Sequence, residues 1–248
     1  MRFVLARAKD PQAIGVREMY AIKTSLTTLI AAAALAAPAS AMTVVYENDF
    51  ESGAAGPEWS KTDTGTSPAG ENFLGNFGRN IVELTLTDLP AHNEVTVSFD
   101  LYLIKSWDGV GEFGNDSWWL AVDGEKQFES TFSNAAELPG EGQHYPNPAN
   151  DTDIHAPRSG ATANNSLGFT FAGVPTDSTY RMNFTIPHTG GDLVIRFRGG
   201  RELESLGNES WALDNVEVGV SAIGEPVPAP GAAAALALGL AGATRRRR

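Results

Sequence analysis

Hydrophobic and polar residues alternate along much of the middle of the chain. The stretch EVTVSFDLYLI, residues 94–104, has the clearest alternation. One of its faces carries Val95, Val97, Phe99, Leu101 and Leu103, and the other carries Thr96, Ser98, Asp100 and Tyr102. A period of two over this length predicts a strand with one buried face.

Three further stretches alternate in the same way: IVELTLT (81–87), TYRMNFTI (179–186) and DLVIRFR (192–198). The stretch SWWLAVDGEKQFESTF (117–132) predicts two strands joined at Asp123-Gly124, a dipeptide that favours tight hairpin turns. Between the hydrophobic ends of the chain, no long stretch has the period of an amphipathic helix. The pattern predicts an all-β fold, a two-sheet antiparallel sandwich of the jelly-roll kind.

Residues 134–166 interrupt this rhythm with a segment that contains four prolines and two of the four histidines. A loop of this length in a compact domain is typical either of a functional segment or of a poorly ordered one. The sequence leaves both readings open.

The N-terminal region has the layout of a secretory signal peptide. Lys23 precedes an apolar segment at 26–37, and the small residues of Ala39-Ser40-Ala41 follow. We therefore expect export and cleavage after Ala41. A permanent membrane anchor is disfavoured because the apolar segment is short for a hydrocarbon layer of ~30 Å. Residues 1–18 are an unusual mixed-charge extension, and a start at Met19 would give a signal peptide of ordinary shape.

The C-terminal region, EPVPAPGAAAALALGLAGATRRRR, consists of three parts. Three prolines within residues 225–230 favour an extended spacer, and residues 231–243 are small and apolar. Four arginines end the chain and favour the cytoplasmic side of a membrane. The predicted element is a short transmembrane helix that serves as a transient anchor, and a disordered basic tail is the alternative.

This layout resembles the PEP-CTERM sorting signal of exopolysaccharide-producing Gram-negative bacteria over about the last 23 residues. Pro228 and Pro230 flank Ala229, where the family has Pro-Glu-Pro. The resemblance implies processing by an exosortase-type transpeptidase at the inner membrane and a final location on the cell surface or in the extracellular matrix. The chain then divides into a signal region at 1–41, a β-sandwich domain at 42–224 and a sorting tail at 225–248.

The charge of the central region restricts its partners. Residues 42–224 hold 9 of the 18 basic and 27 of the 30 acidic residues, a formal charge of −18. This balance excludes nucleic acid as the expected partner because a polyanion would be repelled. Either divalent cations or the needs of solubility account for so many carboxylates. With no cysteine, the chain has no disulfide, thiol nucleophile or thiolate metal site.

The two ends of the predicted domain suggest a calcium site. In ESWALDNVEV, Asp214 has the parity of Val216, whereas Leu213 has the opposite parity. Either the strand has a bulge near Leu213, or Asp214 faces the core and needs a cation. Glu51 could then share a Ca²⁺ ion with Asp214. Oxygens of Asn48 and Asp49 would add to the ligand set, and the alternative is that Asp214 and Asn215 cap a bend.

The same ends carry a second resemblance. The opening DFE and the closing W-x-L-D-N-V, residues 49–51 and 211–216, are similar to the ends of concanavalin A-like and carbohydrate-binding-module sandwiches. The resemblance implies that the terminal strands lie side by side and share a structural calcium ion. It also implies that the domain binds a glycan, with the exopolysaccharide of the producing cell as the expected partner.

A second acidic cluster lies in SWDGVGEFGNDSWW, residues 106–119. Its glycines allow the loop to fold back, so that oxygens of Asp108, Glu112 and Asp116 could converge on an ion. Trp107 and Trp118 could stack on a sugar ring, with Asp108 and Asp116 binding its hydroxyl groups. The alternative is an ordinary turn whose tryptophans belong to the core.

Catalytic signatures are weak. The stretch ALDNVE has the spacing of the glucanase pattern E-x-D-x-x-E, but Ala212 stands at the nucleophile position. The four histidines are scattered, and no metalloprotease or serine-hydrolase motif is present. We therefore expect a non-catalytic surface protein that binds glycan with calcium support. A structural surface protein without a ligand and an unrecognised glycoside hydrolase remain as alternatives.

Overall fold

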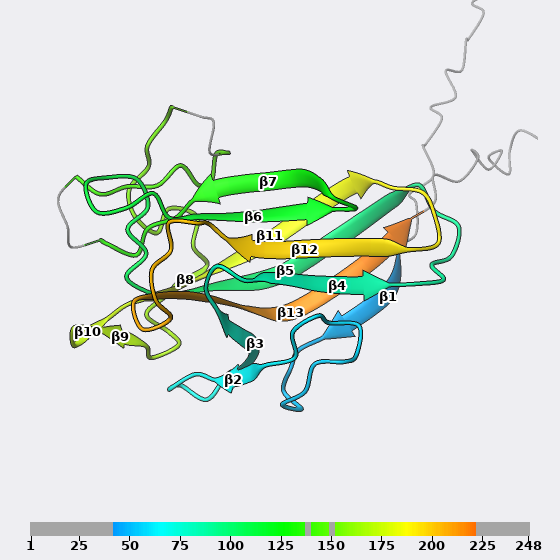
Figure 1. Ribbon diagram of the computed structural model, residues 1–248, viewed down its shortest axis with the longest axis horizontal. Helices are drawn as coiled ribbons and strands as arrows, with labels where there is room; N and C mark the ends of the chain where they lie inside the picture. The colour runs from blue at the N-terminus through cyan, green and yellow to red at the C-terminus, as the bar shows by residue number, and fades with distance from the viewer. Residues whose placement is uncertain (1–41, 137–139, 149–151, 222–248) are drawn as a thin grey trace, which may run out of the picture. The chain divides into compact units, whose positions relative to one another are not determined.

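The structure, a computed structural model, describes residues 42–136, 140–148 and 152–221 (Figure 1). The predicted signal peptide with Ala41, and the predicted sorting tail with Pro228 and Pro230, lie outside the described residues. Within the described ranges every regular element is a strand, and no helix of a length and hydrophobicity suited to crossing a membrane is present.

The strands follow one another from the N-terminal end of the described chain to its C-terminal end. Their bounds are β1 (Thr43–Asn48), β2 (Thr64–Thr66), β3 (Asn72–Phe77), β4 (Ile81–Leu86), β5 (Glu94–Lys105), β6 (Ser117–Val122), β7 (Glu125–Thr131), β8 (Ala163–Asn164), β9 (Thr170–Phe171), β10 (Val174–Pro175), β11 (Asp177–Pro187), β12 (Leu193–Gly199) and β13 (Glu209–Ser221).

The strands form two main antiparallel sheets. The larger has the order β2-β3-β13-β5-β11-β8, with β1 also paired to β13, and the smaller has the order β4-β12-β6-β7. The short strands β9 and β10 form a separate hairpin. Figure 1 shows the four-stranded sheet in front of the long strands β5, β11 and β13. The predicted all-β, antiparallel fold is confirmed.

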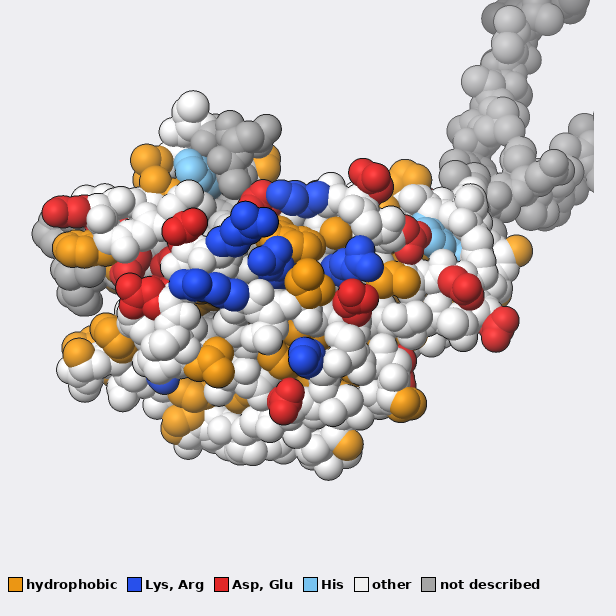
Figure 2. Space-filling model, viewed as in Figure 1, with side chains coloured by type: hydrophobic (Ala, Val, Ile, Leu, Met, Phe, Trp, Pro, Cys, Tyr) orange, Lys and Arg blue, Asp and Glu red, His pale blue; other side chains and the backbone are white. Residues whose placement is uncertain are grey.

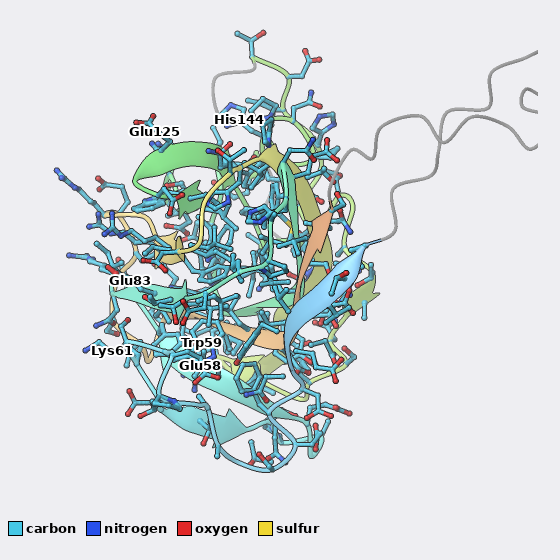
Figure 3. The ribbon with its side chains drawn as sticks, turned by 90° about the vertical axis from the view of Figure 1, so that its right-hand side faces the viewer. Glu58, Trp59, Lys61, Glu83, Glu125 and His144 are labelled. Carbon is cyan, nitrogen blue, oxygen red and sulfur yellow. The ribbon has the colours of Figure 1, made fainter. Side chains whose placement is uncertain are left out.

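Aromatic side chains from the two sheets fill the space between them. Phe99 of β5 contacts Phe197 of β12 and Trp118 of β6, with ring centroids 5.3 and 5.6 Å apart. Trp118 also meets Trp211 of β13 at 6.0 Å. Figure 3, turned by 90°, shows the side chains between the layers, with Trp59 among them. Burial of these large rings supplies the stability of a domain that has no disulfides.

The strands predicted from alternation are present and their expected faces are buried, but Ser98 and Tyr102 on the other face of β5 are buried as well, Tyr102 in a second, smaller hydrophobic cluster. Leu101 and Leu103 of β5 are buried in the core between the sheets, as are Ile195 and Phe197 of β12. The predicted hairpin joins β6 to β7, and its turn residues Asp123 and Gly124 have φ angles of 48° and 85°. Two positive φ angles in succession match the tight turn that this dipeptide favours.

A bulge in β13 changes the expected position of Asp214. Asp214 lies opposite Asp100 of β5 and Glu217 lies opposite Ser98, so two residues of β13 face one residue of β5. Asn215, within the bulge, has a φ of 48°. The bulge lets Leu213 and Val216 both point into the core and turns Asp214 to the outer face of the sheet. Of the two sequence-based alternatives, the bulge is correct.

Candidate metal centre

Three carboxylates from separate strand ends meet at one end of the sandwich. Asp108 follows β5, Asp116 immediately precedes β6, and Glu209 is the first residue of β13. One carboxylate oxygen of each lies within 4.8 Å of the others. No other group of three or more acidic, histidine or cysteine side chains in the described ranges comes this close together.

The loop between β5 and β6 folds back on itself to bring the two aspartates together. The backbone N–H of Asp108 donates to Oδ2 of Asp116 at 2.6 Å, and the N–H of Asp116 donates to the Gly109 carbonyl at 2.9 Å. Gly109 has a φ of 74°, and a Cβ atom there would lie 2.0 Å from the Gly142 carbonyl oxygen. Only glycine fits this close approach of two backbones.

Glu209 is held from the opposite side. Its Oε2 accepts a hydrogen bond from the Glu204 N–H at 2.6 Å. The neighbouring Ser210 carbonyl accepts a hydrogen bond from the Trp107 indole at 2.9 Å, which ties the end of β5 to the start of β13. Asp116 and Glu209 are almost fully enclosed, with exposed fractions of 1% and 2%.

Burial and mutual repulsion raise the pKa of all three carboxyl groups. Burial, followed by the charges of Glu141 and Glu204, raises the pKa of Asp108 to about 6. Burial and the charge of Asp108 raise the pKa of Asp116 to about 6, although backbone N–H groups partly oppose this. Glu209 has the largest shift, because burial and the aspartate charges raise its pKa to about 8. Each group is therefore costly to ionise without a nearby positive charge.

The residues that the structure describes supply no such charge as an ion-pair partner. Among the described residues, no lysine, arginine or histidine forms an ion pair with any of the three carboxylates. A fourth carboxylate, Glu141, lies on the neighbouring segment, and its charge raises the pKa of Asp108. Glu141 is 9% exposed; its Oε1 accepts the Glu112 N–H, and its Oε2 is buried without a partner among the described residues. The cluster thus has excess negative charge and an unused oxygen acceptor.

The donor set suits a hard divalent cation. Calcium binds carboxylate, carbonyl and water oxygens at about 2.3–2.6 Å, so two oxygens on one ion are at most about 5 Å apart. The separation of up to 4.8 Å between the three oxygens falls within this limit. Calcium takes six to eight oxygens. Three carboxylates with backbone carbonyls or water molecules would complete that number.

An open pocket of about 590 Å³ adjoins the cluster. Asp108 forms part of its wall, and the other lining residues come from the β5–β6, β7–β8, β8–β9 and β12–β13 loops, the β9–β10 hairpin and the residue that follows it. Two aromatic rings at the pocket are open to solvent, since Phe113 is 63% and Phe171 is 37% exposed. Arg158 adds a guanidinium group, whereas the amide of Asn134 already donates to the Leu103 and Lys105 carbonyls. The pocket therefore combines apolar surface with polar groups, as ligand sites commonly do.

The ligand set predicted at the domain ends is not assembled in this way. The Asp214 carboxylate accepts the Tyr102 hydroxyl at 2.6 Å and the Asn215 N–H at 2.7 Å. Burial, followed by the charges of Asp100 and Glu51, raises its pKa to about 6, so Glu51 lies within electrostatic reach of Asp214. Glu51 instead accepts hydrogen bonds from Asn72 on β3. Asp214 therefore caps the bulge, in agreement with the alternative based on local hydrogen bonds.

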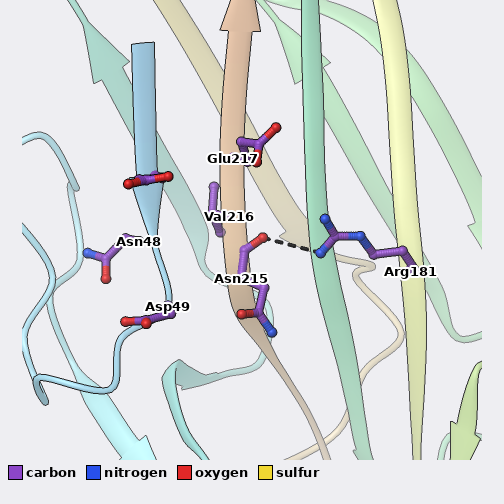
Figure 4. Close-up of a pocket in the computed structure, with 7 residues that line it drawn as sticks. Asn48, Asp49, Arg181, Asn215, Val216 and Glu217 are labelled. Carbon is purple, nitrogen blue, oxygen red and sulfur yellow. Dashed lines mark hydrogen bonds between the residues drawn. The ribbon is translucent and has the colours of Figure 1, made fainter. Parts of the chain in front are cut away.

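Asn48 and Asp49 lie beside the bulge instead. They line a polar pocket of about 540 Å³ together with Asn215, Glu217 and Arg181 (Figure 4). Oδ1 of Asn48 and Oδ1 of Asp49 each accept the backbone N–H two residues ahead, so both residues shape the turn after β1. Figure 4 shows Arg181 reaching toward the Asn215 carbonyl, to which it donates at 3.3 Å.

The aspartates of the second predicted cluster lie together, but its tryptophans are not available to a ligand. Asp108 and Asp116 do converge, whereas Glu112 contributes only its backbone N–H to Glu141. Trp107 and Trp118 are 0% exposed, so neither ring can stack on a sugar in this structure. Both belong to the core, because each packs between the sheets.

Sequence reasoning missed Glu209, although a signal was present. Glu209 shares the parity of Trp211 and Leu213, which both face the core. Alternation alone therefore predicts that the Glu209 carboxylate faces inward. The position of Glu141 had no comparable signal, because it lies in a loop without a repeating pattern.

Two of the histidines that are scattered in the sequence meet at the other end of β5. Nε2 of His92 and Nδ1 of His188 are 2.7 Å apart, and Nε2 of His188 lies 2.9 Å from Oδ2 of Asp123. Nδ1 of His92 lies 2.6 Å from the Pro90 carbonyl oxygen. This chain of polar contacts ties together the loops that precede β5 and β12 and the β6–β7 turn.

Comparisons with known proteins add two distant similarities. No family model and no curated protein matches the sequence. The dimeric latent PorU from Porphyromonas gingivalis is similar at 13% identity and a TM-score of 0.39, over 77% of this chain and 14% of that one. The Agl-KA catalytic domain is similar at 16% identity and a TM-score of 0.32, over 80% of this chain and 31% of that one. The chain therefore spans less than a third of either structure.

Proposed function

We propose that this protein is an exported, non-catalytic β-sandwich of the jelly-roll kind that binds glycan at its loop end with the support of a calcium ion. The ion is held by Asp108, Asp116 and Glu209, and the glycan occupies the pocket that Asp108 borders. The predicted signal peptide and the PEP-CTERM-like tail support a location of the domain at the surface or in the matrix of a Gram-negative cell.

One observation supports this proposal above the others. Three carboxylates, two of them enclosed, converge without a basic partner among the described residues, at the wall of an open pocket. An unpaired buried charge is too costly to keep, so either protons or a cation must neutralise the group. At extracellular calcium concentrations, even a weak site would be filled. The ion would fix the end of β5 and the start of β13, and with them the pocket wall.

The exposed aromatic rings favour a glycan in the pocket over a purely structural protein. Phe113 and Phe171 present exposed apolar surface at the pocket, and Arg158 adds a guanidinium group to its lining. Pyranose rings have an apolar face and hydroxyl edges, and aromatic faces with flanking hydrogen-bond donors match both. A protein without a ligand would gain nothing from this exposed apolar surface.

A glycoside hydrolase is the second candidate, because a carboxyl group with a pKa of about 8 resembles a general acid. The position of Glu209, the residue with this pKa, is unfavourable for a general acid. Glu209 and Asp116 are enclosed to 98% or more, so a substrate in the pocket would reach only Asp108. One accessible carboxylate cannot act as both nucleophile and acid. The burial therefore favours metal binding over hydrolysis.

Terbium luminescence tests the metal centre directly. Terbium replaces calcium, and Trp107, next to Asp108, would sensitise its emission. We expect saturable emission that calcium displaces. The Asp116→Asn variant should weaken binding by roughly tenfold or more, because the ligand charge sets the affinity. Asp214→Asn removes a carboxylate of similarly raised pKa from the outer face of the sheet and serves as the matched control, with unchanged binding expected.

An equal loss of terbium affinity in Asp116→Asn and Asp214→Asn would contradict the metal centre. The absence of saturable emission in the unaltered protein would also contradict it. Pulldown on the producer's exopolysaccharide with and without EDTA tests the glycan part, and binding that EDTA weakens is expected. Calcium binding with no retention on any polysaccharide would favour the structural protein. Release of reducing sugar from a polysaccharide panel would favour the hydrolase.

A further inference from the structure

The outer face of the four-stranded sheet carries a second aromatic surface. The chain has five tryptophans, and four of them are 4% exposed or less. Trp119 on β6 is the exception, because it is partly exposed. The adjacent residue of the same strand, Trp118, points into the core. β6 and β12 are the central strands of this sheet, so the indole ring lies in the middle of the face. An exposed tryptophan at such a position is a common feature of binding surfaces.

Arginines without ion pairs lie beside this ring. Arg198 of β12 is directly opposite Trp119, with its guanidinium carbon 5.7 Å from the ring centroid. On its other side, Arg198 faces the apolar Ile81 of β4. Its Nε is buried and has no hydrogen-bond partner among the described residues. Arg201, which is exposed just after β12, forms no ion pair within the described chain.

The other charged residues of this face are mostly matched in pairs. Lys126 and Glu129 are 2.6 Å apart, and Arg196 and Glu83 are 3.1 Å apart. Figure 2, which faces this sheet, shows lysine and arginine side chains gathered over its centre, with acidic side chains mainly toward the rims. Charges beyond about 8 Å are largely screened at physiological salt. The groups on this face, and not the charge of −18 on the region as a whole, therefore set the local potential, and Arg198 and Arg201, which form no ion pair among the described residues, outnumber Glu202 there.

A shallow pocket of about 370 Å³ joins these groups. Its lining includes Trp119, Arg198 and Arg201, the polar Asn115 and Ser117, the ion pair of Lys126 with Glu129, and one further acidic residue, Glu202. None of these residues lines the pocket beside the metal centre. The two sites are therefore separate surfaces of the domain.

We propose that this face is a second, calcium-independent site that binds acidic polysaccharide through its uronate units. The carboxylate of a uronate would accept hydrogen bonds from Arg198 and Arg201, which suits the planar guanidinium group. The apolar face of the same sugar ring would lie on Trp119. A polymer of such units can engage the flat face of the sheet repeatedly, without a deep cleft.

Binding to polygalacturonate in EDTA tests this site, because EDTA removes the metal centre from the measurement. We expect binding that weakens with rising salt, and none to neutral dextran. Arg198→Gln and Arg201→Gln should each weaken it by about three- to tenfold, and Trp119→Ala by about tenfold. Arg181→Gln removes the same charge from the outer face of the other sheet and should leave it unchanged.

Three results would overturn the proposal. The first is the absence of binding to polygalacturonate in EDTA. The second is equal weakening by Arg181→Gln and Arg198→Gln, which would indicate a general effect of net charge. The third is equal affinity for polyglutamate or single-stranded DNA, with Trp119→Ala unaffected, which would indicate a site for charge alone. Because EDTA is present throughout, none of these results depends on whether the metal centre exists.

Discussion

The enclosed glutamate at the start of β13 determines how the candidate metal centre behaves. Glu209 is 2% exposed, and its pKa is raised to about 8 by burial and by the two aspartates. Near neutral pH the group therefore carries a proton, unless a cation displaces it. The same side chain would destabilise the domain when ionised alone and stabilise it when bound to calcium.

Substitution of Glu209 should change the melting temperature in opposite directions in EDTA and in calcium. In EDTA at pH 8.5, Glu209→Gln removes an unfavourable charge, so we expect a melting temperature equal to or above that of the unaltered protein. In millimolar calcium, the variant lacks one ligand and should melt lower than the unaltered protein. Scanning calorimetry in both buffers tests whether the order of the two melting temperatures reverses. Two melting curves that keep the same order in both buffers would contradict it.

Glu217→Gln is the control for Glu209→Gln. Glu217 lies on the same strand and lines the polar pocket near Arg181, far along β13 from the cluster. The substitution makes the same chemical change, so its effect should not depend on calcium. A calcium-dependent shift in Glu217→Gln would indicate that the ion binds elsewhere.

The bulge in β13 has a similarly specific requirement. Asn215 adopts a φ of 48°, in the left-handed region that glycine and asparagine tolerate and β-branched residues avoid. Its side chain also donates to Asp100 at 2.9 Å and to Asp214 at 3.2 Å. The residue thus combines a backbone role with a polar one.

Two substitutions separate these roles. Asn215→Gly and Asn215→Val both remove the side-chain hydrogen bonds, but only valine is strained at a positive φ. We expect the valine variant to be less stable than the glycine variant by about 1–2 kcal/mol. Urea unfolding measures the difference. Equal stabilities would show that the bulge does not depend on the left-handed conformation.

Alternation along the strands predicted most of the fold, because it reports a local property. Each of the stretches at 81–87, 94–104, 179–186 and 192–198 became a strand with the expected face buried. The same rule separates the adjacent tryptophans, since Trp118 shares the parity of the buried Leu120 and Trp119 does not. Applied there, it would have assigned Trp118 to the core and Trp119 to the surface.

The candidate metal centre was only half predictable. Asp108 and Asp116 are separated by a short glycine-containing loop, and their convergence follows from that loop. Glu209 joins them only because β13 pairs with β5, a contact between residues far apart in the chain. No local pattern encodes that pairing. The histidine pair was hidden for the same reason, because β5 and β11 place His92 beside His188.

The two ends of the sandwich differ in chemistry. The acidic cluster and its pocket lie at the end where β5 finishes, and the His92–His188–Asp123 contacts lie at the end where β5 begins. The outer face of the four-stranded sheet presents Trp119 and Arg198 between these ends. The proposed cation, pocket ligand and acidic polymer would thus bind at separate surfaces of one domain, an arrangement suited to multivalent attachment.

The stability of the whole domain should connect calcium with pH. The pKa values of Asp108 and Asp116 are raised to about 6 and that of Glu209 to about 8, so the folded state binds these protons more tightly than the unfolded state. The stability that this protonation supplies is complete at low pH and is lost as pH rises through these values. In EDTA, the melting temperature should therefore fall between about pH 5 and pH 9.

Calcium binds the ionised carboxylates, so its effect should grow over the same range. At a calcium concentration of 100 times Kd, binding adds about 2.7 kcal/mol of stability. For a domain of this size, that corresponds to an increase of roughly 5–10 °C in melting temperature. We expect this gap in melting temperature between calcium and EDTA to be small at pH 5 and to approach its full size by pH 9.

Asp214, whose pKa is also raised to about 6, contributes to the pH dependence of the melting temperature in EDTA but not to this gap. An Asp116→Asn/Glu209→Gln double variant should therefore lose the gap, whereas Asp214→Asn should keep it. A gap that does not change with pH would place the ion away from these three carboxylates.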